Sequence, residues 1–226
     1  MAVALTNLAA VVAQRWEHEQ GRAEALYGEA LASWRGLDED QAVAMVLVSL
    51  GDLERRQGGA ADAAAHYREA LPLLAAVGDR RGVADAQLGL GLVATAAGEV
   101  GDAVALLGEA LATYRAMDLR AEIAASLEGL VALSHARGEA EGAARLAGAA
   151  LALRAVIDAP VPAAEQAAYD RLLAALGEAL GAERFAEAVA DGERADPSLL
   201  AAEALSPVGT AATREKRPPT ETGPAG

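Results

Sequence analysis

The chain has 226 residues, 53% of them hydrophobic and only 3% aromatic, with a formal net charge of −14 at pH 7. Alanine and leucine supply most of the apolar content, and this composition favours close-packed helices over a β-sheet. The acidic balance, with Lys216 as the only lysine, argues against nucleic acid as a partner. The absence of cysteine excludes disulfides, thiolate metal sites and cysteine nucleophiles.

The segment from Met1 to Ala13 is apolar enough to raise the question of a signal peptide. No lysine or arginine precedes this apolar run, which argues against a signal peptide. Asn7, Gln14 and Arg15 interrupt it before it reaches the roughly 18 apolar residues of a membrane span. We therefore expect no membrane contact and a cytoplasmic protein.

Helical spacing of apolar residues predicts four pairs of helices along the first two thirds of the chain. The predicted helices cover residues 2–17 and 20–35, 41–57 and 60–77, 81–97 and 100–117, and 121–137 and 140–157. Short polar connectors separate the pairs, so each pair is predicted to be a helical hairpin. Pro72 should kink or shorten its helix, because proline lacks a backbone donor and crowds the preceding turn.

These hairpins repeat at a fixed interval of 40 residues. The recurring features are a Leu-Gly pair, a turn glycine and a small-residue pattern: Leu50-Gly51, Leu90-Gly91 and Leu130-Val131; Gly58, Gly98 and Gly138; Ala63, Ala103 and Ala143; Ala70-Leu71, Ala110-Leu111 and Ala150-Leu151. Ala23 and Ala30-Leu31 belong to a more degenerate copy at the start of the chain. A fixed period between 20 and 50 residues predicts a solenoid, in which each unit packs only on its neighbours.

The pattern resembles the tetratricopeptide repeat, and the third unit carries it most clearly. Leu90-Gly91, Gly98, Ala103, Leu107 and Ala110 occupy its Leu-Gly, turn-glycine and small, large, small positions. The first unit departs from it, with Ala10-Val11 in place of Leu-Gly and His18 in place of the turn glycine. The resemblance implies an all-α, right-handed solenoid with repeats at about 1–38, 39–78, 79–118 and 119–157.

The repeat pattern stops at Pro160-Val161-Pro162, which no helix is expected to cross. Further helices are predicted at 163–180, at 183–191 and from Pro197 to about Leu205, where Asp196 supplies a cap. We interpret residues 158–205 as a C-terminal helical cap, because the end of a solenoid needs a polar outer face. Residues 206–226 are rich in Pro, Thr, Gly and charge and are predicted to be disordered.

Several segments together are similar to one group of bacterial regulators. They are the Gly-Asp-Arg-Arg-Gly connector at 78–82, the Ala-rich run at 143–150, Ala-Pro-Val-Pro at 159–162 and Arg184-Phe185-Ala186. They look like the C-terminal repeat region of actinobacterial signal-transduction ATPases and of LuxR-type or antibiotic-regulatory transcriptional regulators. The resemblance implies a separated sensor arm of an ATP-hydrolysing regulator or a free-standing repeat protein.

No catalytic, cofactor or metal site is predicted. Gly89-Leu90-Gly91-Leu92-Val93-Ala94 satisfies a dinucleotide fingerprint, but it lies within a helix and not at a strand-to-helix turn, so helix packing explains it better. The three histidines, His18, His66 and His135, fall in different repeats with no neighbouring nucleophile in the pattern. Trp16, Tyr27 and Trp34 are expected to pack in the core of the first hairpin or to form a docking edge. We therefore predict a non-enzymatic protein without cofactor.

The family resemblance implies that the first helix of each unit lines a concave surface. Positions 2, 5 and 9 of each unit, counted from Ala4, Ala44, Ala84 and Ala124, should point into it. The candidate groove residues, rim charges included, are Leu5, Leu8, Val12, Arg15, Met45, Val48, Asp52, Arg55, Asp85, Leu88, Leu92 and Glu128. The alternative is that superhelical curvature buries these side chains within the array.

An apolar groove with a charged rim indicates an interaction site. An amphipathic helix or a second copy of the chain, and hence a possible homodimer, suits it better than a charged peptide tail. The predicted function is a protein-binding or peptide-binding scaffold that acts as a sensor or regulatory arm. The alternative is a C-terminal fragment of an ATP-hydrolysing transcriptional regulator whose other modules lie outside this chain.

Overall fold

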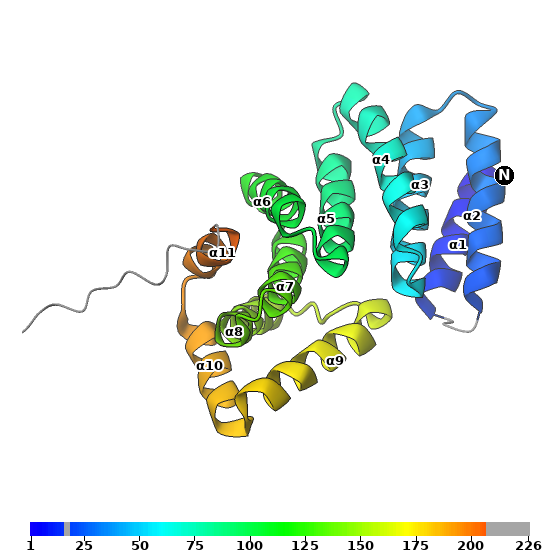
Figure 1. The fold of residues 1–226 in the computed structure, drawn as a ribbon. Helices are drawn as coiled ribbons and strands as arrows, with labels where there is room; N and C mark the ends of the chain where they lie inside the picture. The colour runs from blue at the N-terminus through cyan, green and yellow to red at the C-terminus, as the bar shows by residue number, and fades with distance from the viewer. Residues whose placement is uncertain (16–18, 207–226) are drawn as a thin grey trace, which may run out of the picture.

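The computed structural model describes residues 1–15 and 19–206, and every regular element in this part of the chain is an α-helix. The helices are α1 (Ala2–Arg15), α2 (Gln20–Arg35), α3 (Asp40–Gln57), α4 (Ala60–Ala76), α5 (Arg80–Ala97), α6 (Val100–Ala116), α7 (Arg120–Ala136), α8 (Ala140–Val156), α9 (Ala163–Leu180), α10 (Ala182–Arg194) and α11 (Pro197–Leu205). The first eight form four hairpins in a curved row, while α9 lies beneath the row and α10 and α11 pack at its C-terminal end (Figure 1). The predicted α-solenoid is confirmed.

Left-handed residues end the helices at regular intervals along the chain. Gly58, Gly98 and Gly138 end the first helices of three hairpins with φ of 85°, 75° and 76°. The second helices end at residues spaced by 40, with φ between 50° and 72°: Asp38, Gly78, Asp118 and Asp158. Aspartate tolerates this region better than most non-glycine residues. These positions fix both the length of each helix and the 40-residue period.

Glycines allow the two helices of a hairpin, and successive hairpins, to approach closely. A Cβ at Gly51 would lie 2.7 Å from the Tyr67 ring, and one at Gly89 would lie 2.3 Å from the same ring. A Cβ at Gly91 would lie 2.8 Å from Leu107. The Gly89-Leu90-Gly91 sequence therefore serves packing within a continuous helix, as its position in the repeat predicts.

The hydrophobic core extends along the whole row of hairpins in separate groups of buried residues. One group of buried apolar residues extends from α1 to α5 and a second from α5 to α11. The large residues that are almost fully buried include Tyr67, Tyr114, Leu107 and Leu130. Ala63, Ala103 and Ala143, the small positions of the second helices, are completely buried. The repeated pattern of the sequence is thus the pattern of the core.

The first hairpin differs from the others by one residue in the placement of α1. Ala9 and Val12 of α1 are completely buried, and Leu50 and Leu53 of α3 are at most 5% exposed. Ala9 therefore corresponds to Leu50 and Val12 to Leu53, which aligns the two helices at an interval of 41 residues. Ala23 in α2 keeps the 40-residue interval to the buried Ala63 in α4. One additional residue therefore separates the two helices of the first hairpin, and the Leu-Gly position falls at Ala9-Ala10 instead of Ala10-Val11.

The last repeat is covered by α10, whose backbone touches that of α8. A Cβ at Gly148 would lie 2.0 Å from the carbonyl oxygen of Val189, and one at Gly192 would lie 1.9 Å from that of Arg145. Helix α11 follows, with the Asp196 carboxylate accepting from the Ser198 amide at 2.7 Å as its cap. Arg137 donates to the carbonyl oxygen of Ala204 at 2.7 Å and so holds the end of α11.

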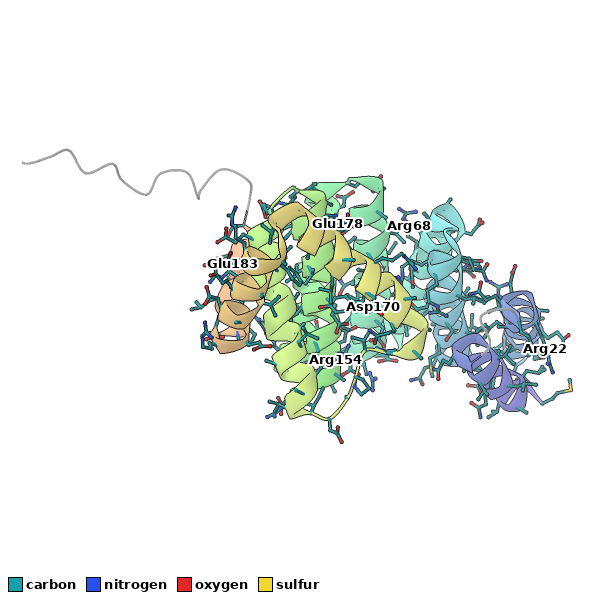
Figure 2. The ribbon with its side chains drawn as sticks, turned by 90° about the horizontal axis from the view of Figure 1, so that it is seen from below. Arg22, Arg68, Arg154, Asp170, Glu178 and Glu183 are labelled. Atoms are coloured by element: carbon teal, nitrogen blue, oxygen red, sulfur yellow. The ribbon has the colours of Figure 1, made fainter. Side chains whose placement is uncertain are left out.

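Helix α9 takes a different course from that of a terminal cap. Its N-terminal end lies near α1 and α3, from where the helix extends beneath α7 to α10, and Figure 2 shows it from below lying across the neighbouring helices. The prediction that α9 to α11 together cover the end of the solenoid therefore needs correction, because α10 and α11 do so and α9 covers the concave side.

The structure tests the predicted effect of Pro72 on its helix. Helix α4 continues past Pro72 to Ala76, so the proline does not shorten it. The tail predicted to be disordered covers residues 206–226, of which 207–226 fall outside the described residues. Trp16 and His18, with their predicted roles, fall outside them too. Among the helices of the described residues, none is long and apolar enough to cross a membrane.

Candidate functional site

A cavity of about 880 Å³ lies between the first helices of three hairpins and α9. Its walls come from α3, α5 and α7, with contributions from the α4–α5 connection, and α9 closes one side. The apolar part of the lining is formed by Met45, Val48, Leu74, Leu88, Leu92, Ala125, Ala132, Val161, Ala168, Tyr169 and Leu172. A concave site of this size, mostly apolar with a few polar groups, is typical of binding pockets.

Eight of the twelve predicted groove residues line this cavity: Met45, Val48, Asp52, Arg55, Asp85, Leu88, Leu92 and Glu128. Met45 is 55% exposed, whereas Val48, Leu88 and Leu92 are half-buried. Leu88 also packs against two groups of core residues. Met45 is therefore the better position for probing the cavity without disturbing the core.

Three of the four predicted groove residues of α1, Leu5, Leu8 and Val12, do not line the cavity. Val12 is completely buried in the core and Leu5 packs partly against it, so neither forms a groove surface. Leu8 is 43% exposed but lies outside the cavity lining. The one-residue offset of α1 explains this error, because it turns Val11 to the surface and Val12 to the core. The side chain of Arg15 lies outside the described residues.

Side chains from the second helices reach the polar groups of the first helices at one repeated position. Trp34, Tyr114 and Arg154 are separated by multiples of 40 residues, and each donates to a first helix. Their acceptors are Thr6 at 3.1 Å, Asp85 at 2.7 Å and Glu128 at 2.8 and 3.0 Å. The carboxylates of Asp85 and Glu128 are thus held in place by side chains of the second helices.

Asp52 is held by a second tyrosine. The Tyr67 hydroxyl of α4 donates to the Asp52 carboxylate at 2.7 Å. Burial raises the pKa of Asp52 despite the opposing effects of Arg55 and of this hydrogen bond. Burial likewise raises the pKa of Asp85, against the effects of Tyr114 and Arg81. The cavity therefore contains two desolvated carboxyl groups among apolar side chains.

An ion-pair cluster joins α9 to α3 at the edge of the cavity. The Arg55 guanidinium lies 2.6 Å from the Glu165 carboxylate, and that of Arg56 lies 3.6 Å from it. Burial alone would lower the pKa of Arg55, but the neighbouring Glu165 raises it above its ordinary value, so Arg55 stays charged. These contacts fix the N-terminal end of α9 over the cavity.

Sequence reasoning missed the contribution of α9 to the site. Its cavity residues are Glu165, Ala168, Tyr169 and Leu172, with Val161 just before the helix. Their spacing of three and four residues marks one face of a helix, but this apolar face was assigned to the core of a cap. The sequence contains no signal that distinguishes packing on the end of the array from packing on its concave side.

The Ser49 hydroxyl and the His66 imidazole both have hydrogen-bond partners within the helices. The Ser49 hydroxyl, which lines the cavity, donates to the Met45 carbonyl at 3.0 Å, and His66 pairs with Glu54 at 2.8 Å away from the lining. Within residues 1–15 and 19–206, no group of three or more His, Asp or Glu side chains could hold a metal ion. The geometry is that of a concave, largely apolar cavity between packed helices.

Comparisons with known proteins support this interpretation of the repeats. Residues 43–116, from α3 to the end of α6, match the family described as "Tetratricopeptide repeat". The structure also resembles the crystal structure of BtubC (BKLC) from P. vanneervenii, with a TM-score of 0.60 and 23% identity over 90% of this chain and 79% of that chain. At this identity the likeness concerns the fold alone. No curated protein matches the chain. Residues 43–116 thus match tetratricopeptide repeats, which are generally protein-interaction scaffolds and typically non-catalytic.

The Asp52→Asn variant is expected to change the pH dependence of stability. Burial raises the pKa of Asp52 in the folded protein above 3.8, so the folded state favours the protonated carboxyl group. The protein therefore loses stability as the pH rises through this raised pKa and the buried group becomes charged. Asparagine has no charge to desolvate and its carbonyl oxygen can still accept from Tyr67. The free energy of unfolding of the variant minus that of the wild type should therefore be larger at pH 7 than at pH 3.5. Urea titrations at both pH values measure this difference, and a difference that is equal at both would contradict the assignment.

Proposed function

We propose that the cavity between α3, α5, α7 and α9 binds a segment of another protein, and that the chain acts as a non-catalytic scaffold. The observation that supports this most directly is the half-open apolar lining, with Met45 55% exposed and Leu88 and Leu92 half-buried. Exposed apolar surface inside a concave site costs free energy in water, and a partner side chain that fills it recovers that free energy.

Most of the charged groups around the cavity are paired within the protein. Five carboxylates line it, from Asp52, Asp79, Asp85, Glu128 and Glu165, against the guanidinium groups of Arg55 and Arg81. Most of these charges already have partners within the protein, so the apolar lining is the free surface. An amphipathic helix that inserts its apolar face suits such a site.

The biological role that we propose is that of a sensor or regulatory arm. The alternative is a C-terminal part of an ATP-hydrolysing transcriptional regulator, and it rests on the sequence resemblance of residues 143–150, 159–162 and 184–186. In either role the same cavity would receive the partner. A second copy of the chain is a further candidate partner, since α1 exposes three large apolar side chains, those of Val3, Leu8 and Val11.

A display library of helical peptides panned against the protein tests the cavity. Peptides with apolar residues at a spacing of three and four are expected to be enriched. The Met45→Glu variant should weaken their binding by at least about tenfold, because it places a charge in the apolar lining. Leu199→Glu is the matched control, because Leu199 is 65% exposed on α11 and lies outside the cavity. Equal binding to both variants would show that the peptides bind elsewhere.

A further inference from the structure

Helix α9 is connected to the rest of the protein by a non-helical joint at each end. Ala159, Pro160, Val161 and Pro162 precede it outside any helix, and Pro162 has φ −55° and ψ 137°. Gly181 follows with φ 78° and ψ 152°, a conformation that residues other than glycine rarely adopt. These joints separate α9 from α8 and from α10, so its N-terminal half can swing away from the array without unwinding those neighbours.

The packing of α9 is much lighter than that of the repeat helices. Only Tyr169 and Leu176 among its 18 residues are buried, whereas eight residues of the adjacent α8 are. Leu176 joins the core group of α5 to α11 and so fixes the C-terminal half. The N-terminal half instead faces the cavity, and the ion pairs of Glu165 with Arg55 and Arg56 hold it there.

This half of α9 contacts the array as a bound amphipathic helix would. Glu165, Ala168, Tyr169 and Leu172 stand at positions i, i+3, i+4 and i+7, the spacing by which helical ligands place their contact residues in grooves. The arrangement leaves polar atoms unsatisfied, because the Tyr169 hydroxyl and Arg55 Nε are both buried without a partner. Each such group costs free energy, so the α9 contact is weaker than an optimised one.

We propose that the surface of α3, α5 and α7 beneath α9 is a helix-docking site whose internal occupant is the N-terminal half of α9. Its external partner is an amphipathic helix that displaces this half and places a carboxylate of its own between Arg55 and Arg56. The proposal rests on the proposed function of the cavity and adds the chemistry of the partner and the means of its control. Glu165 is then the contact that sets how readily the site opens.

The probe for this proposal is a fluorescein-labelled synthetic peptide of residues 159–180 with blocked termini. The full-length Glu165→Ala variant is expected to bind it at least about tenfold more tightly than the wild type does, because the internal competitor has lost its ion pairs. The control is Glu178→Ala, which removes an exposed carboxylate from the same helix and should leave the affinity at the wild-type value. A peptide carrying Glu165→Ala should bind the Glu165→Ala protein at least about tenfold more weakly than the unmodified peptide.

Hydrogen exchange gives a readout that does not depend on the peptide. Amides in the N-terminal half of α9 should exchange faster in Glu165→Ala than in the wild type, while those of α10 should not change. Equal peptide affinity for the wild type and Glu165→Ala, or unchanged exchange in α9, would overturn the proposal. If library-selected peptides bound both proteins equally and lost affinity with Met45→Glu, the cavity would still be a binding site, with α9 as a fixed wall.

Discussion

Replacing Arg154 with alanine is expected to destabilise the protein by about 3–5 kcal/mol, because it leaves a buried carboxylate without its partner. Two guanidinium nitrogens of Arg154 donate to the two Glu128 oxygens at 2.8 and 3.0 Å. The two side chains are only 8% and 13% exposed, so water replaces the lost bonds only in part. Urea unfolding monitored by circular dichroism measures the change.

Two control variants show whether the loss comes from this buried pair. Arg145→Ala removes an exposed contact with Glu203, 3.4 Å long, and should cost less than about 1 kcal/mol. The double variant Arg154→Leu with Glu128→Val reproduces Leu74 and Val48, the residues at the same positions in the second repeat. It should recover most of the stability, because an apolar pair has no charge to desolvate. A loss of less than about 1 kcal/mol in Arg154→Ala would show that the ion pair is not buried in solution.

The variant Gly192→Ala is expected to separate α10 from α8 and to cost about 1–3 kcal/mol or more. Its Cβ would lie 1.9 Å from the carbonyl oxygen of Arg145, a backbone atom that cannot rotate away. Gly148→Ala should have the same effect, since its Cβ would lie 2.0 Å from the carbonyl oxygen of Val189. Hydrogen exchange should then show loss of protection in α10 before the repeats unfold.

Gly142→Ala is the control for both variants, because Gly142 lies in α8 together with Gly148 and no atom lies within 4 Å of the added Cβ. Alanine is the better helix former, so this variant should be about 0.5–1 kcal/mol more stable than the wild type. If Gly192→Ala were as stable as Gly142→Ala, the close contact between α8 and α10 would be wrong.

The fold could be predicted from the sequence because local and repeated signals agree. Gly58, Gly98 and Gly138 take the left-handed conformation expected at the turn, and Ala63, Ala103 and Ala143 are completely buried. Each helix therefore carries its own start, end and buried face within 40 residues. The alignment of the first hairpin is wrong by one residue, because neither Ala9-Ala10 nor Ala10-Val11 carries the Leu-Gly pair that fixes the register in the second and third repeats.

The candidate site could be predicted only in part. The groove residues of α3 and α5 follow from helical spacing, since residues on one face of a first helix point the same way. The position of α9 depends on contacts between distant segments, such as that of Glu165 with Arg55, and no local pattern encodes them. The same holds for the pairing of Glu128 with Arg154, which removes a predicted rim charge from the surface.

The most direct measurement of the proposed binding site is a methyl NMR titration of the full chain with a library-selected helical peptide. The methyl groups of Val48, Leu88, Leu92 and Leu172, which line the cavity, are expected to shift on binding. Those of Leu199, which is 65% exposed on α11, should not change. Shifts confined to residues outside the cavity, with these four methyl-bearing residues unaffected, would contradict the assignment of the concave cavity as the binding site.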